Sequence, residues 1–281
     1  MWRPVAAFVF LLTVSPGVRT QHYSWWSDNP QPYLEAIKKF RAVAPPTLAP
    51  NKRIRAGIVS HHFLASGLMV RFFDTLRAEC SPATIILIGP NHFHHGSANI
   101  SLSLLPWKTP FGLLETDQRV VQQIEAATSL PEDREAFTGE HSVGVLIPFL
   151  KYYFPHCRVV PILVDANAQE FSLKEIQGAL SGFLRDPQIL VLLSMDFSHN
   201  STTDIADGRD KEAQGAISAL DLSKVQGLNV DCRKGLWLLL ASLRELGQVE
   251  VQVSEHTNSA RLTGNLHQPD VTSYFSIFFR R

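Results

Sequence analysis

Runs of apolar, mostly β-branched residues recur along the chain, each bounded by polar or turn-forming residues. Such runs are typical of strands that are buried on both faces of a sheet. They predict buried strands at 54–60, 85–88, 158–164 and 189–194. Alternating or shorter runs predict further strands at 99–105, 249–254 and 271–279.

Between these runs, apolar residues recur at the spacing of three and four that marks one face of a helix. This spacing predicts helices over 33–43, 68–79, 117–127, 143–153, 172–184, 210–220 and 234–246. Strands and helices alternate, and a strand–helix–strand unit predicts two parallel strands. The expected fold is therefore α/β, a three-layer α/β/α sandwich with a central mostly parallel or mixed sheet.

The chain divides into three segments by composition. Residues 1–20 hold a short apolar run, 5–14, that suits a signal peptide or a membrane anchor, although a buried N-terminal strand is the alternative. Residues 21–51 form a Pro-rich extension, and the globular domain is expected over 52–281. If the protein is exported or anchored to a membrane, residues 1–20 are expected to be the segment responsible. Otherwise the protein is expected in the cytoplasm.

Charge and cysteine content exclude several classes of protein. The 26 basic and 26 acidic residues give a formal net charge of zero, which argues against a nucleic-acid or anionic-membrane surface. Three cysteines argue against a disulfide framework and leave room for at most one pair. The chain has no GxGxxG, GxxxxGK[ST] or CxxC motif.

Histidine marks the ends of three predicted strands, at His61, His92 and His199, and helix starts add His141 and Cys232. A single histidine near a strand end is most often structural. Taken together, however, these residues should meet, because the carboxyl ends of parallel strands share one edge of the sheet, where α/β proteins bind ligands.

The residue types at this edge favour a metal site. Imidazole and thiolate bind Fe, Cu or Zn, so His61, His92 and Cys232 are the candidate ligands. Cys232 lies at a predicted helix start, which favours the thiolate, but a small buried hydrophobe is an equally good interpretation.

Other polar residues at this edge suit catalysis. His199 and His141 are candidate proton carriers, and Asp196 could orient a ligand imidazole or cap a helix. Asp196 and His199 are three residues apart, which in a loop or a first helical turn puts both on one face. Asn91, at a strand end, is a candidate substrate-binding residue. Glu140 could simply cap a helix.

Several segments, in this order, resemble those of the Memo family, also called AmmeMemoRadiSam system protein B. They are GIVSHHFLASG (57–67), ILIGPNH (86–92), WKTPFG with the downstream Asp117 (107–117), EHSVGVLIPFL (140–150), VVPILV (159–164), LSMDFSH (193–199), the Cys232 segment and VTSYF (271–275). The resemblance covers about residues 52–281. It implies the fold of the class III extradiol dioxygenases, a metal on His61, His92 and Cys232, and pocket residues His141, Asp196 and His199. It also implies a functional link to a radical-SAM protein.

The chain departs from the family pattern beside the expected site. The family usually has Pro-His-Ala-Gly where this chain has 60–63, Ser-His-His-Phe; Gly144 replaces an acidic residue and Arg233 replaces a glycine. A permanent charge at Arg233 would weaken a metal site or recruit an anionic substrate.

Three functions remain open from the sequence. The first is a Memo-like metal-binding protein that works as a redox-active non-haem metal oxidoreductase. The second is a Zn-dependent hydrolase on the same scaffold. The third is a non-enzymatic module whose vestigial pocket binds a small-molecule or peptide ligand.

Overall fold

The computed structural model describes residues 23–24, 29–41, 52–128 and 130–281. The predicted signal or anchor segment, 1–20, and the Pro-rich stretch 44–51 lie outside the described residues. Across the described residues, no helix combines the length and the apolarity that a membrane crossing requires.

The core of the fold is a mixed eight-stranded sheet with strand order β10-β11-β2-β8-β3-β7-β4, and β9 pairs with β11. β2, β8, β3 and β7 run parallel, whereas β11 and β4 join them antiparallel. The strands are β2 (Ile54–Val59), β3 (Thr84–Pro90), β4 (Ile100–Leu102), β7 (Arg158–Val164), β8 (Ile189–Ser194), β9 (Phe197–Ser201), β10 (Glu250–Asn258) and β11 (Val271–Arg280). A second small sheet holds β1 (Tyr23–Ser24), β5 (Trp107–Thr109) and β6 (Gly112–Leu114).

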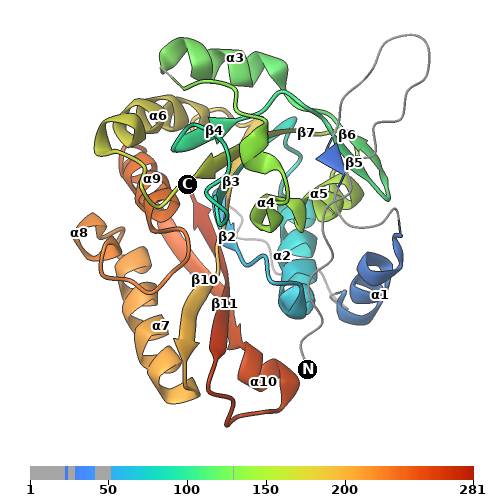
Figure 1. Cartoon of the computed structure of the whole chain (residues 1–281), viewed down its shortest axis with the longest axis vertical. Helices are drawn as coiled ribbons and strands as arrows, with labels where there is room; N and C mark the ends of the chain where they lie inside the picture. Colours follow the sequence, from blue (N-terminus) through green and yellow to red (C-terminus); the bar gives the residue numbers. More distant parts are fainter. Residues whose placement is uncertain (1–22, 25–28, 42–51, 129) are drawn as a thin grey trace.

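Helices cover both faces of this sheet (Figure 1). One face carries α3 (Gln118–Ala127), α6 (Glu170–Phe183), α7 (Thr203–Ser218), α8 (Leu222–Val225) and α9 (Arg233–Arg244). The other carries α1 (Gln31–Phe40), α2 (Ser66–Glu79) and α5 (Ile147–Tyr153), and α4 (His141–Gly144) and α10 (Ser259–Thr263) lie at the ends of strands. The predicted three-layer α/β/α sandwich is confirmed.

Strand β3 shows why the apolar runs predicted this architecture. Its residues alternate between the two cores: Ile86 and Ile88 pack on the α6 and α9 side, while Ile85 and Leu87 pack on the α2 and α5 side. A strand that is buried on both faces needs apolar side chains at every position.

Several elements differ from the prediction. Helix α7 begins at Thr203 rather than at residue 210, and β4 covers only Ile100–Leu102 of the predicted strand 99–105. Residues 197–201 form strand β9, which pairs with β11, where a loop or a first helical turn was expected. The predicted helix 143–153 is interrupted between α4 and α5, and Pro148 lies in the first turn of α5. Proline lacks the N–H that a continuous helix would need at this point.

The segment before residue 52 contributes to the core through α1. Tyr33 and Ile37 are buried, and the Tyr33 ring contacts those of Phe63 and Phe149 edge-on at centroid distances of 5.2 and 5.0 Å. α1 therefore belongs to the same packed unit as residues 52–281.

Strand register brings the expected site residues together. Val59 of β2 pairs with Ser194 of β8, and Leu193 of β8 pairs with Ile88 of β3. The three parallel strands therefore end at one level, and the chain emerges there at His61, His92 and Asp196.

Candidate metal centre

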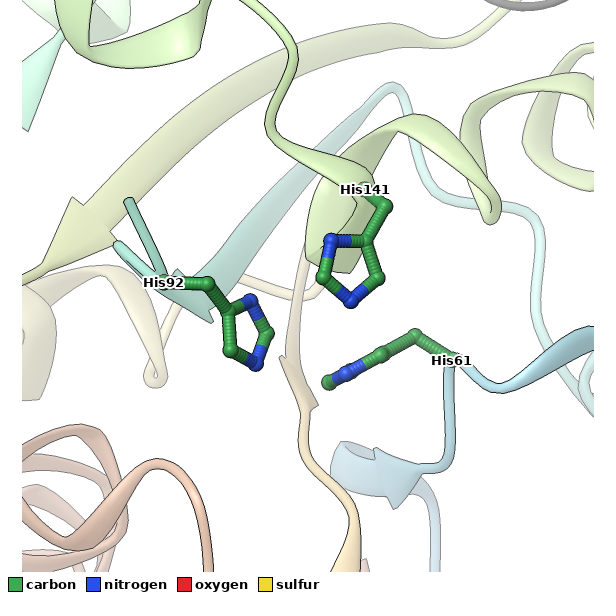
Figure 2. A group of neighbouring side chains, drawn as sticks. All are labelled: His61, His92 and His141. Atoms are coloured by element: carbon green, nitrogen blue, oxygen red, sulfur yellow. The ribbon is translucent and has the colours of Figure 1, made fainter. Parts of the chain in front are cut away.

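Three imidazoles meet at the carboxyl edge of the sheet. His61 follows β2, His92 follows β3, and His141 begins α4. Ring centroids lie 5.2 Å apart for His61 and His92, 5.3 Å for His61 and His141, and 4.3 Å for His92 and His141. One nitrogen from each ring lies within 4.8 Å of the other two, and the rings point toward a common centre (Figure 2).

His61 is almost completely buried and is held by Ser194, the last residue of β8, and by Asp196 just beyond it. Its backbone N–H donates to Asp196 Oδ1 at 3.1 Å, and its Nδ1 lies 3.0 Å from Ser194 Oγ. Because the Ser194 hydroxyl donates to the carbonyl of Ser142, Ser194 Oγ accepts from His61 Nδ1–H. The lone pair of neutral His61 is therefore on Nε2, which faces the centre.

His92 is oriented by Glu140. The carboxylate accepts the His92 backbone N–H at 2.7 Å and lies 2.8 Å from the ring Nδ1. It also caps α4 by accepting the backbone N–H of Ser142 at 2.8 Å. Glu140 is thus a helix cap, as one expectation had it, and at the same time the group that fixes the ring of His92.

His141 is placed by close contact between α4 and β3. The Ser142 hydroxyl donates to the carbonyl of Pro90 at 2.9 Å. A Cβ at Gly89 would lie only 2.7 Å from Ser142 Oγ, so glycine is what lets α4 approach the strand. The His141 side chain is 39% exposed, which makes it the most accessible of the three imidazoles.

Two carboxylates complete the cluster. Asp231 Oδ2 lies 3.3 Å from His61 Nε2 and 3.7 Å from His92 Nε2, and Asp196 Oδ2 lies 3.6 Å from His61 Nε2. His61, Asp196 and Asp231 thereby form a second group of ligand atoms within 4.8 Å of one another, which shares His61 with the imidazole group.

The surroundings give the three imidazoles different pKa values. Burial lowers the pKa of His61 to about 3, against the pull of Asp231. Burial also opposes the charging of His92, but Asp231 and Glu140 outweigh it and raise the pKa of His92 to about 10. The pKa of His141 is lowered by burial and by the charge of His92.

The surroundings shift the pKa values of two carboxylates in opposite directions. Burial disfavours the charged form of Glu140, yet the hydrogen bond from His92 outweighs it and lowers the pKa of Glu140 to about 2. Burial raises the pKa of Asp196, although the nearby His62 and His199 act in the opposite direction. His199 therefore lies close enough to influence Asp196 electrostatically.

Cys232 lies beside the cluster and packs into the core. Its side chain is buried with the apolar residues of one core face, and burial, followed by the charge of Asp231, raises the pKa of the thiol well above its usual range. Among the described residues, none of the groups that could hold a metal includes its sulfur.

The remaining predicted residues lie around this edge. Asn91 is buried and shapes its loop, because its side chain donates to the carbonyl of His95 at 2.8 Å. Arg233 is exposed at the first position of α9. His199 lies in β9, half-buried, and its backbone N–H donates to Asn229 Oδ1 at 2.8 Å.

Sequence reasoning missed Asp231. It follows no predicted strand, and the only signal was a carboxylate directly before the helix that carries Cys232. With Asp231 the cluster offers imidazole nitrogens and carboxylate oxygens, a donor set that suits Zn, Fe or Cu.

A third group of possible ligands, Asp207, Asp210 and His256, lies outside this edge. Asp207 already pairs with both terminal nitrogens of Arg261, and His256 Nε2 contacts Asp210 Oδ2 at 2.7 Å. These partners give the group a structural explanation.

Two proteins described as MEMO1 family proteins match most of this chain in sequence. The chain is 28% identical to a MEMO1 family protein of Pyrobaculum aerophilum over 236 residues, which cover 80% of this chain and 83% of that protein. It is 27% identical to a MEMO1 family protein of Methanothermobacter thermautotrophicus over 231 residues, which cover 78% and 83%.

A solved structure shares the fold. The crystal structure of an uncharacterized protein from Escherichia coli K12 superposes with a TM-score of 0.54 at 13% identity, and the match covers 79% of this chain and 98% of that chain. The model of the family described as Memo-like protein matches residues 21–277, so the match takes in helix α1 as well as the sheet. The resemblance seen in the sequence is confirmed: the chain belongs to the Memo family.

Proposed function

We propose that this member of the Memo family binds one transition-metal ion at the edge of its sheet and works as a non-haem metal oxidoreductase. One observation carries the proposal. The ring Nδ1 atoms of His61 and His92 face Ser194 and Glu140, so their Nε2 atoms face the same centre, beside Asp231. Partners of this kind orient the histidine ligands of metal sites.

The roles follow from position and exposure. His61 and His92 would hold the ion, which when bound supplies Lewis acidity and, if it is Fe or Cu, one-electron chemistry. His141 is more exposed, and its lowered pKa keeps the ring neutral near pH 7, so it can accept a proton from a bound substrate. His199, at the same edge, is the second candidate proton carrier.

A Zn-dependent hydrolase is the second candidate function, and the number of imidazoles favours it. Three histidines with an open fourth position are one of the catalytic zinc arrangements. In that case His141 would act as a ligand rather than as a base. The identity of the retained metal separates the two functions.

The test is the metal content of the full chain after purification, measured by inductively coupled plasma mass spectrometry beside His92→Ala and His156→Ala. His156 is an exposed histidine away from the cluster and serves as the matched control. We expect about one equivalent in the parent and in His156→Ala, and a large loss in His92→Ala. A folded parent without metal after growth in Fe-, Cu- and Zn-supplemented medium would contradict the proposal.

The reaction class needs a second measurement. Iron-loaded protein prepared without oxygen is exposed to O₂ or hydrogen peroxide and followed by electron paramagnetic resonance. Appearance of a ferric signal that His92→Ala lacks would support redox chemistry. Retention of zinc alone, with metal-dependent cleavage of an ester or amide panel, would support the hydrolase instead.

A further inference from the structure

We propose that Asp210 of helix α7 is a positioning residue: it holds a bulge of strand β9 in a strained conformation and so keeps His199 beside Asp196 at the edge of the sheet. Asp210 would act through Ser198, without touching the ion or a substrate. The inference rests on the proposed function, because His199 is the second candidate proton carrier there.

Strand β9 lies directly beyond the end of β2. Strand β11 pairs with β10 along one side and with β9 and then β2 along the other. Its partner is β9 at Ser273 and β2 at Ser276. β9 therefore continues the position of β2 in the sheet, past the point where the chain leaves β2 toward His61. This placement explains why His199, in the middle of β9, acts on the charge of Asp196.

β9 carries a bulge centred on His199. Phe197 pairs with Ser273 of β11, and Ser201 pairs with Val271. Three residues of β9 therefore lie opposite a single residue of β11. A bulge changes the direction of the side chains within it, and bulges are frequent beside active sites. The direction of the His199 side chain thus depends on how this bulge is held.

The backbone is strained on both sides of His199. Ser198 has a φ of 30° and Asn200 a φ of 54°, in the left-handed region that residues with a Cβ avoid. Asparagine tolerates this region better than serine does, so Ser198 is the residue that needs support. Strained residues persist only where their surroundings hold them, and they cluster at functional sites.

Asp210 supplies this support from the first half of α7. The Ser198 hydroxyl donates to Asp210 Oδ1 at 2.6 Å, and Asp210 Oδ2 lies 2.7 Å from His256 Nε2 on β10. Ser198 and Asp210 are each only 1% exposed. If Ser198 left its conformation, a buried carboxylate oxygen would lose its donor, which is costly where water cannot replace it.

Asn229 fixes the backbone of the same bulge. The N–H of Ser198 donates to the carbonyl of Asn229 at 2.9 Å, and the N–H of His199 donates to Asn229 Oδ1 at 2.8 Å. These bonds satisfy two N–H groups of the bulge. With the backbone fixed by Asn229 and the Ser198 side chain fixed by Asp210, His199 keeps little freedom.

The test compares two substitutions that both remove the Ser198 hydroxyl. Ser198→Ala loses the bond to Asp210 and keeps the steric cost of a Cβ, so the bulge should relax. Ser198→Gly loses the same bond, but glycine adopts a positive φ without that cost, so His199 should stay in place. Asp210→Ala should behave like Ser198→Ala. Ser242→Ala is the matched control, because Ser242 is fully buried and donates to the carbonyl of Leu238 at 2.8 Å.

The readout is the position of His199 in the full chain after removal of metal by a chelator. The protein is labelled with ¹³C-histidine, and the ring signal that is missing in His199→Gln is assigned to His199. We expect this signal to shift in Ser198→Ala and Asp210→Ala, with amide exchange of 198–200 faster by about tenfold or more. Ser198→Gly and Ser242→Ala should keep the parent's signal. Urea unfolding measures stability in parallel.

A parent-like His199 signal in Ser198→Ala or Asp210→Ala, even with reduced stability, would show a merely structural role and overturn the inference. An equal displacement of His199 in Ser198→Gly and Ser198→Ala would overturn it as well. If Asp210→Ala does not fold, the two Ser198 variants decide. Because these proteins carry no metal, a parent that fails to bind metal would overturn the proposed function without changing this result.

Discussion

Glu140 receives the backbone N–H of His92 at 2.7 Å and contacts its ring Nδ1 at 2.8 Å, and the same carboxylate caps helix α4. One side chain therefore joins the end of β3 to the helix that carries His141. The separation of these two imidazoles, 4.3 Å between ring centroids, depends on this link.

Replacing Glu140 with glutamine should weaken metal binding without removing a ligand. The amide keeps the size of the side chain but loses the charge that orients His92. We expect affinity for Zn(II) to fall by roughly 10–100-fold, as for other partners of ligand histidines. Chelator competition measures the effect, and Glu135→Gln, at an exposed position nearby, is the control. Unchanged affinity in Glu140→Gln would show that His92 is not held for a metal.

Gly89→Ala should disturb the site through packing. The new methyl would meet Ser142 Oγ at 2.7 Å, so α4 must move away from β3. We expect a loss of roughly 1–3 kcal/mol in the free energy of unfolding, together with weaker metal binding. In Gly178→Ala, on the exposed side of α6 with open space around it, stability should instead rise by about 0.5–1 kcal/mol. Urea unfolding of both variants tests the contrast; equal stabilities would argue against the close approach.

Metal affinity should rise with pH. In the metal-free protein the pKa of His92 is raised to about 10, so below that pH a proton competes with the ion for the ring. Release of one proton predicts an apparent affinity that increases ~tenfold per pH unit between about pH 6 and 9 and then levels off. Titration calorimetry in buffers of different ionisation enthalpy counts the released proton. A pH-independent affinity over that range would contradict the prediction.

A buried ion pair far from the site should matter for stability alone. Arg280 at the end of β11 pairs with both carboxylate oxygens of Glu79 in α2, and the two side chains are only 3% and 7% exposed. Glu79→Gln leaves the arginine charge without its partner and should cost about 3–5 kcal/mol. Lys52→Ala, which removes an exposed pair with Glu250, should cost about 0–1 kcal/mol. Thermal unfolding distinguishes the two, and a Glu79→Gln loss as small as that of Lys52→Ala would be evidence against burial of the pair.

The meeting of His61 and His92 was predictable because it depends on strand order along the sheet edge. Apolar runs such as 85–88 are strong signals, and the residues that follow them must emerge at one level when the strands are parallel and in register. The strand β9 was not predictable in this way. Its short polar sequence carries no apolar alternation, and only pairing with β11 makes it a strand.

The approach of Asp231 to His61 lies beyond sequence reasoning. Donor chemistry alone favours the cysteine, because thiolate is a strong ligand for Zn, Fe and Cu. In the structure Asp231 Oδ2 lies 3.3 Å from His61 Nε2, whereas the Cys232 sulfur packs beside Gly235. No sequence pattern gives the direction of either side chain. The contact of Glu140 with His92 was also not predictable, because a glutamate that only caps a helix and one that also orients a histidine look the same in a sequence.

The most direct measurement is anomalous diffraction from crystals of the full chain soaked with Zn(II) or Fe(II). We predict one peak at the carboxyl edge of the sheet, about 2.0–2.2 Å from the Nε2 atoms of His61 and His92. A well-occupied peak elsewhere, for instance between Asp207, Asp210 and His256, with none among the three imidazoles, would contradict the account.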